Sequence, residues 1–166
     1  ALADSNIHQL ITNYGVGGVV LQAKNDNFIG PVDTTLQAAD LIQSLQTSVW
    51  DASTSGAESG SAVEGAAPFI PLFVGISQEG DNTPNDQIIS GLSPLPNLMA
   101  IGATWDSRYA EKVGEVMGRE LSALGFNLYL GPSLDVLDVL QTDSGEDLGT
   151  RTFGSDPYWV ARMGEA

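Results

Sequence analysis

Residues 70–80 read Ile-Pro-Leu-Phe-Val-Gly-Ile-Ser-Gln-Glu-Gly. The part from Ile70 to Ile76 is apolar almost throughout and lacks the alternation of a strand with one solvated face, so it predicts a strand buried on both faces. Pro71 is compatible with this because strands tolerate proline at their first residues. Such strands occur in parallel sheets connected by helices, and the segment therefore predicts an α/β fold.

The rest of the chain continues this alternation of strands and helices. In chain order the predicted elements are a helix over Ile7–Tyr14, a strand over Gly18–Leu21, a helix from Thr34 to about Trp50, the strand over Ile70–Ile76, a helix between Asp106 and Gly125, a strand over Phe126–Leu130 and a helix that starts at Pro157. Helices are predicted from apolar residues three and four apart, and strands from short apolar runs. A doubly wound sheet and a (β/α)8 barrel both fit this order, and periodicity does not decide between them.

The predicted helices have recognisable ends. Thr34, followed three residues later by Gln37, fits a capping box. Asp106 fits an N-cap, and Gly125 fits a left-handed C-cap at the other end of the same helix. The helix that starts at Thr34 is expected to turn four apolar residues towards the core, namely Leu41, Ile42, Leu45 and Val49.

Three long loops separate these elements. Asp51–Ala67 is small, polar and glycine-rich, and predicts a flexible loop. Ser77–Pro96 and Gly131–Asp156 each follow a strand, and in the barrel alternative the site is built from the loops at the carboxyl ends of the strands. We therefore expect these two loops to face a site. Asp51–Ala67 follows a helix, so it should lie at the opposite end of the sheet without a functional role.

Composition excludes several classes of function. The chain has 6 Lys+Arg and 21 Asp+Glu, for a net charge of −15. This charge repels nucleic acid and anionic membranes, and it suits a neutral ligand such as a sugar or a role in solubility alone. The absence of cysteine excludes disulfides, thiolate catalysis and Cys-ligated metals. No apolar stretch reaches the roughly 18 residues of a membrane-spanning helix, so membrane insertion is not predicted.

The sequence leaves the cellular compartment and the oligomeric state open. Scarce lysine and abundant Ser, Gly and Ala favour an exported or cell-envelope protein over a cytoplasmic one.

Three functional motifs can be rejected from the sequence. The glycines of Gly15–Gly18 precede a strand, whereas a dinucleotide fingerprint follows one. Asp135–Asp147 lacks EF-hand spacing. With His8 as the single histidine, near the terminus, no Ser/His/Asp triad is available. We predict no cofactor and no metal site.

Four stretches together resemble the N-terminal domain of glycoside hydrolase family 3, and especially its bacterial β-N-acetylglucosaminidases. They are Gly17–Leu21 with Asn25, Pro71–Gly80, the stretch from Gly118 through Phe126-Asn127 to Val136, and Gly149–Pro157 (GTRTFGSDP). Each stretch alone is weak, but four in register are fairly specific. The resemblance covers nearly the whole of residues 1–166, as one partial barrel domain, except the Asp51–Ala67 loop.

The resemblance implies an exo-acting, retaining β-glycosidase on a (β/α)8 barrel of which only the N-terminal part is present. Retaining hydrolysis uses a carboxylate nucleophile and a separate acid/base. In the family both lie on later strands or loops, so we expect no catalytic residue in this chain and no activity from residues 1–166 alone. The family's usual first strand is expected to be missing before Ile7. Alternatives are a non-catalytic carbohydrate-binding or structural relative and a β-glucosidase.

The resemblance also assigns substrate-binding residues. Arg151 matches a family arginine that holds sugar hydroxyls; the competing interpretation is a salt bridge to Glu146 or Asp156. Asp135 matches a family Asp that could accept from sugar hydroxyls, hold Arg151 or only shape its loop. Glu79 matches a position that contacts ligand or shapes the turn. At Ser77 the family usually has a sugar-binding Asp.

Asp81 is a second departure, because the glucosaminidases usually have glycine there. Ser77 is shorter than the family's Asp and neutral. The loss of charge-assisted hydrogen bonds, worth about 1.5–3 kcal/mol each, is expected to weaken sugar binding or change which sugar fits.

Overall fold

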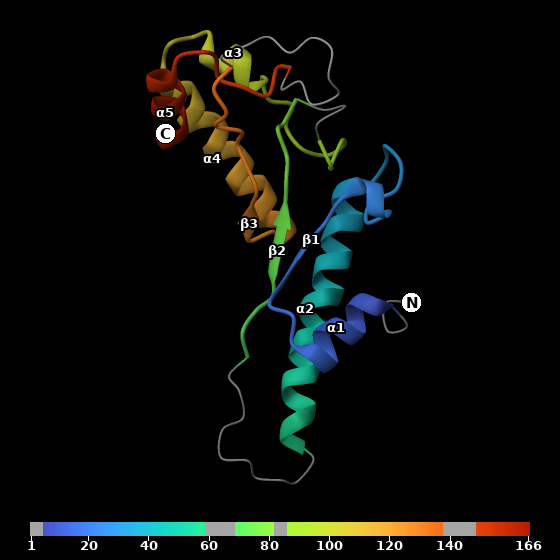
Figure 1. The fold of residues 1–166 in the computed structure, drawn as a ribbon. Helices are drawn as coiled ribbons and strands as arrows, with labels where there is room; N and C mark the ends of the chain where they lie inside the picture. The colour runs from blue at the N-terminus through green and yellow to red at the C-terminus, as the bar shows by residue number, and fades with distance from the viewer. Residues whose placement is uncertain (1–4, 59–68, 82–85, 138–148) are drawn as a thin grey trace.

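The computed structural model describes residues 5–58, 69–81, 86–137 and 149–166. Figure 1 shows helices and strands alternating along the chain, as predicted. The elements are α1 (Asn6–Tyr14), β1 (Gly18–Val20), the 3-10 helix η2 (Ala23–Asn25), α2 (Thr34–Glu58), β2 (Phe73–Ile76), α3 (Leu98–Gly102), α4 (Ser107–Leu124), β3 (Leu128–Tyr129) and α5 (Pro157–Glu165). Sequence patterns did not predict η2 or α3.

The three strands form a parallel sheet in the order β1-β2-β3. Val20 pairs with Gly75, and Gly75 pairs with Leu128. The parallel α/β sheet is confirmed. The strands are shorter than predicted, since residues 70–72 stand before β2 and β3 has only two residues.

Two side-chain amides replace sheet hydrogen bonds at Leu72, just before β2. Gln46 on α2 donates from Nε2 to the Leu72 carbonyl at 2.8 Å, and its Oε1 accepts from the Leu72 N–H at 3.0 Å. Asn127 donates from Nδ2 to the same carbonyl at 3.0 Å, and its Oδ1 accepts from the Val74 N–H at 2.7 Å. Side chains thus satisfy the main chain where the predicted strand would have continued.

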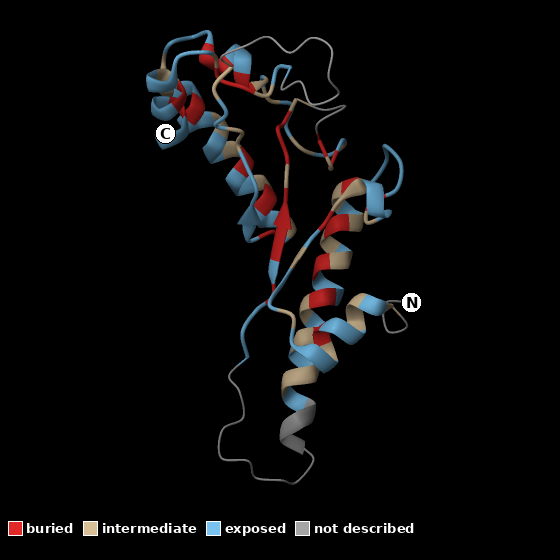
Figure 2. Ribbon diagram, viewed as in Figure 1, coloured by how far each residue is buried: buried red, intermediate tan, exposed pale blue. Residues whose placement is uncertain are grey.

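One face of the sheet carries the larger core, shown by the red segments of β2 and α2 in Figure 2. Val74 and Ile76 are fully buried against α2 and α4. Side chains alternate along a strand, so Phe73 points to the other face, where it is 56% exposed. Val20 and Leu128 are also exposed and share the register of Gly75. The prediction of strands buried on both faces is therefore wrong for the described residues.

A second core lies where α3, α5 and the first turns of α4 meet, at the upper left of Figure 1. Its buried members are Leu98, Ile101, Ala110, Phe153, Val160 and Met163. Phe153 belongs to no helix or strand, yet it is 7% exposed. This core therefore holds the segment that leads into α5 against α3 and α4.

Helix α2 differs from the prediction at both ends. It continues to Glu58, so the first part of the predicted Asp51–Ala67 loop is helical, and residues 59–68 lie outside the described residues. The capping box does not form. The Thr34 hydroxyl contacts Ser90, and the Gln37 side chain bonds the main chain of Ile29 and Val32. The predicted inner face is confirmed, with Ile42 and Leu45 buried and Leu41 and Val49 packed against them.

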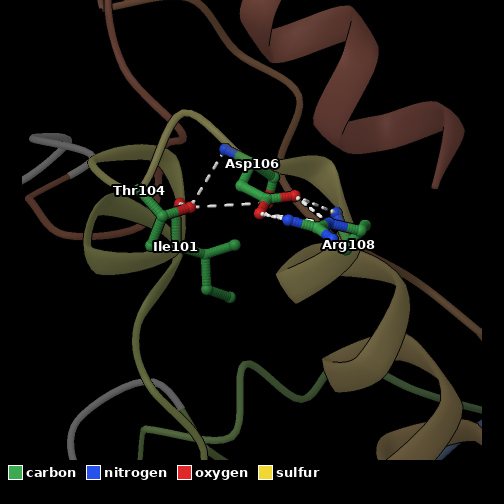
Figure 3. A network of polar contacts seen from close by, with 4 residues as sticks. All are labelled: Ile101, Thr104, Asp106 and Arg108. Atoms are coloured by element: carbon green, nitrogen blue, oxygen red, sulfur yellow. Dashed lines mark hydrogen bonds and ion pairs between the residues drawn. The ribbon is translucent and has the colours of Figure 1, made fainter.

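Both predicted ends of α4 are confirmed. Figure 3 shows Asp106 at the N-cap, where its carboxylate accepts from the Arg108 N–H and its own N–H donates to the Thr104 hydroxyl. Hydrogen bonds from the Arg108 side chain and N–H hold the pKa of Asp106 below its usual value. Gly125 ends the helix with φ 100°, and its N–H donates to the Leu121 and Ser122 carbonyls.

Candidate functional site

The loop that follows β2 is held in place by its own buried polar side chains. Gln78, 2% exposed, donates from Nε2 to the Ile88 carbonyl at 2.8 Å, and its Oε1 accepts from the N–H groups of Gln87 and Ile88. The Oδ1 atom of Asp86 accepts from the Glu79 N–H at 2.7 Å and from the Gly80 N–H at 2.8 Å. The main chain around Glu79 is therefore fixed independently of its side chain.

The segment before α5 is anchored in the same way. Thr152 is completely buried, and its hydroxyl donates to the Asp135 carbonyl at 2.9 Å and accepts from the Gly154 N–H at 3.1 Å. The Met99 N–H at the start of α3 donates to the Thr150 carbonyl at 3.1 Å. These bonds fix the main chain on both sides of Arg151.

An ion pair joins the two segments. Nε of Arg151 lies 3.2 Å from Oε1 of Glu79, across 72 positions of sequence. The Glu79 side chain is 5% exposed and that of Arg151 is 41% exposed. Among the described residues, the buried Oε2 of Glu79 has no hydrogen-bond partner. The pair thus consists of a buried carboxylate and a guanidinium that reaches solvent.

The surroundings of Glu79 disfavour its charge. Burial raises the pKa of Glu79; the hydrogen bond and charge of Arg151 oppose this, while Asp81 and Asp86 add to the rise. Tyr129 at the end of β3 donates its hydroxyl proton to the Gln78 carbonyl at 2.8 Å. Burial, with the nearby Glu79 and Asp86, raises the pKa of Tyr129, so this hydroxyl remains a donor at physiological pH.

A mostly apolar cavity of about 330 Å³ lies beside Glu79. Helices α4 and α5 and the end of β3 form its walls, with Met117, Leu121, Phe153 and Met163 among the lining residues. Glu79 and Tyr129 lie at the same cavity. An apolar wall provides little solvation for a carboxylate, which agrees with the raised pKa of Glu79.

The described residues contain no group of three or more His, Cys, Asp or Glu side chains that could hold a metal ion. In the same part of the chain, every helix is too short or too polar to cross a membrane. The residues around Glu79 offer hydrogen-bonding groups at the carboxyl end of β2, and Arg151 adds a partly exposed cation.

The comparison with protein families decides which fold this sheet belongs to. The model described as "Glycosyl hydrolase family 3 N terminal domain" matches residues 3–166. The chain belongs to glycosyl hydrolase family 3. This confirms the family predicted from the four stretches, and with it the α/β fold of the (β/α)8 barrel type, of which the three-stranded parallel sheet is a part.

Similar proteins include β-hexosaminidase A of Pseudoalteromonas piscicida, 30% identical over 96% of this chain and 23% of that protein. A family 3 β-N-acetylglucosaminidase from Paenibacillus sp. str. FPU-7 superposes with a TM-score of 0.74 at 28% identity, over 98% of this chain and 26% of that one. A β-N-acetylhexosaminidase from Beutenbergia cavernae superposes with a TM-score of 0.65 at 27% identity, over 97% of this chain and 42% of that one. The chain therefore spans about a quarter to two fifths of these proteins.

The structure places the four predicted site residues of this family 3 chain in different environments. Glu79 and Arg151 are brought together. Ser77, directly after β2, is half-buried. Asp135 is exposed, and its carboxylate accepts from the Ser133 hydroxyl at 3.1 Å. Their roles towards a sugar stay predictions.

The competing interpretation of Arg151, a salt bridge to Glu146 or Asp156, can be checked only at Asp156. Asp156 caps α5 by accepting from the Tyr158 N–H at 2.9 Å, and Glu146 lies outside the described residues. Among the described residues, the carboxylate that pairs with Arg151 belongs to Glu79.

Sequence reasoning missed the residues that hold the site. Gln78 lies in the Pro71–Gly80 stretch, and its place between a strand and Glu79 could have indicated a buried role. Thr152 lies in the Gly149–Pro157 stretch, beside Arg151. Asp86 gave no signal in the sequence, because its partners are main-chain N–H groups seven and six residues earlier.

Proposed function

We propose that this chain is part of an exo-acting, retaining β-glycosidase that removes β-linked N-acetylhexosamine, and that the chain supplies part of the sugar-binding site. The observation that carries the proposal is the guanidinium of Arg151, held at the carboxyl end of β2 with 41% of its side chain exposed. A guanidinium keeps its charge and presents donors in a fixed plane, which suits the hydroxyl groups of a sugar ring.

Similar proteins support the choice of sugar. The relative from Pseudoalteromonas piscicida is a β-hexosaminidase, and the Paenibacillus structure is a β-N-acetylglucosaminidase. A protein of Cellulomonas fimi, 32% identical over 57% of this chain, carries the name β-N-acetylglucosaminidase/β-glucosidase. β-Glucosides are therefore the second substrate class to test.

Within this proposal Asp135 and Ser77 are further sugar contacts. The Asp135 carboxylate is exposed and can accept from a hydroxyl group, and Ser77 offers a neutral hydroxyl where the family usually has an acid. Neutral Ser77 and the additional acid Asp81 favour weaker or altered sugar binding. They also motivate the alternative, a non-catalytic carbohydrate-binding relative.

The catalytic nucleophile and acid/base belong, in this proposal, to sequence beyond Ala166. Retaining hydrolysis uses a carboxylate nucleophile and a separate acid/base that face the same glycosidic bond. Glu79 is unsuited to be the nucleophile, because it is buried, it pairs with Arg151 and its pKa is raised. Purified residues 1–166 are expected to show no turnover.

The test uses the full-length protein that contains this chain, with aryl β-N-acetylglucosaminide and aryl β-glucoside as alternative substrates. We expect faster release of the chromophore from the first. Arg151→Ala should lower kcat/KM by about tenfold to a hundredfold, the effect of one lost charged hydrogen bond. The control is Arg119→Ala, which removes an exposed arginine on α4. Inactivity on both substrates would support the binding alternative, and an unchanged rate in Arg151→Ala would remove the site assignment.

A further inference from the structure

The contact between Glu79 and Arg151 is made on one edge of the guanidinium. The Glu79 carboxylate accepts from Nε, and among the described residues this is the hydrogen bond the Arg151 side chain makes. The two terminal nitrogens carry four of the five N–H donors of a guanidinium. A carboxylate on Nε fixes the plane of the group while those four donors remain available to a ligand.

The main chain that carries the Glu79 carboxylate does not depend on Arg151 for its position. The Glu79 N–H donates to Asp86, and Gln78 beside it is bonded to the main chain of residues 87 and 88. Glu79 is also buried, whereas Arg151 reaches solvent. Glu79 is therefore the buried partner on a fixed main chain, and the partner that can contact a ligand is the guanidinium.

Stability alone gives a poor reason for this arrangement. The segment around Arg151 is already held by Thr152 and by the Met99–Thr150 hydrogen bond. A buried carboxylate with one oxygen unpaired carries a desolvation penalty that a half-exposed guanidinium offsets only in part. Such a pair is better explained by the orientation it imposes on Arg151.

We propose that Glu79 is a positioning residue for sugar recognition: it fixes the plane of the Arg151 guanidinium through Nε and does not itself touch the sugar. The proposal rests on the proposed function, because the proposed function is the basis for placing a sugar at Arg151. It differs from the expectation that Glu79 binds substrate directly. It predicts that every effect of Glu79 on catalysis passes through Arg151.

A double-mutant cycle in the full-length protein tests this, with kcat/KM on aryl β-N-acetylglucosaminide as the readout. Glu79→Met keeps the buried volume but removes the hydrogen-bond acceptor, and Glu79→Leu replaces it if the Met variant does not fold. We expect a loss of about tenfold in the wild-type background and almost none in the Arg151→Ala background, because contacting residues are not additive. Glu79→Gln, whose amide oxygen can still accept from Nε, should recover most of the loss.

A second cycle on α4 provides the matched control. Glu115 and Arg119 form an ion pair of 2.7 Å with both side chains exposed, 67% and 69%. Removing either should change kcat/KM by less than about twofold, as expected for a surface pair. Equal losses from Glu79→Met in both backgrounds, no loss at all, or no recovery in Glu79→Gln would each overturn the positioning role. Inactivity of the wild-type protein would instead contradict the proposed function.

Discussion

Gly102 at the end of α3 packs directly against the main chain of Phe153. A Cβ atom added at Gly102 would lie 2.7 Å from the carbonyl carbon of Phe153 and would overlap its carbonyl oxygen. The obstacle is main chain, which cannot rotate away as a side chain can. The close approach of α3 to the segment that carries Arg151 therefore requires glycine at this position.

Gly102→Ala is expected to destabilise the protein by about 2–3 kcal/mol, within the range for overpacking in a core. Gly114→Ala on α4 is the control, since a Cβ atom there meets nothing within 4 Å. It should stabilise by about 0.5–1 kcal/mol, because alanine loses less backbone entropy in a helix. Denaturant unfolding of both variants checks this, and similar shifts of the two would contradict the packing argument.

Glu79→Gln should raise stability at neutral pH. The folded-state pKa of Glu79 is raised above 4.5, so its favourable contribution is complete below pH 4.5 and is lost as the pH rises through the folded-state value. The substitution removes that loss, so the variant should be more stable than the wild type at pH 7. Melting curves between pH 4 and pH 8 should converge with those of the wild type at the acidic end. A constant difference over this range would count against the raised pKa.

Arg151→Ala should have the opposite pH dependence in stability. Without Arg151 the buried Glu79 loses the charge and hydrogen bond that lower its pKa, so the carboxylate becomes more costly at neutral pH. We expect a destabilisation of about 1–3 kcal/mol at pH 7, less than for a fully buried pair because Arg151 is partly solvated. It should shrink near pH 4, where Glu79 is protonated. A double variant with Glu79→Gln should recover most of the loss.

Asn127→Leu should weaken the junction between β2 and β3. It leaves the Val74 N–H without its 2.7 Å acceptor. The Leu72 carbonyl keeps its bond to Gln46. An unpaired buried main-chain donor costs about 1–3 kcal/mol, and hydrogen exchange at Val74 should accelerate accordingly. The exposed Asn13→Leu change is the control; unchanged protection at Val74 in the Asn127 variant would contradict the assignment.

Local signals predicted the helices well where the side chains near the ends also make the caps. Helix α4 runs between the predicted Asp106 and Gly125, because capping and amphipathic spacing depend on neighbours in sequence. Helix α2 was underestimated, since Ser53 and Thr54 usually favour loops. Here their hydroxyls bond the Trp50 carbonyl and leave the helix intact.

At the site, the sequence could not predict contacts between residues that lie far apart in the chain. Arg151 had several acidic candidates nearby, and periodicity does not show that Glu79, 72 positions earlier, is the one beside it. The burial of the strands was overestimated for a related reason. An apolar run shows that Phe73 and Val20 can be buried, but their cover has to come from elsewhere in the fold.

The hydrogen bonds of Gln78, Asp86 and Thr152 have an evolutionary consequence. These buried side chains bind main-chain groups, so the path of both loops does not depend on the identity of Ser77 or Asp135. Mutations at those two positions can accumulate with little penalty in folding. Under the sugar contacts proposed for these two residues, a lineage of such proteins could drift in ligand preference while its scaffold stays constant, and Ser77 in place of an acid is the kind of change this permits.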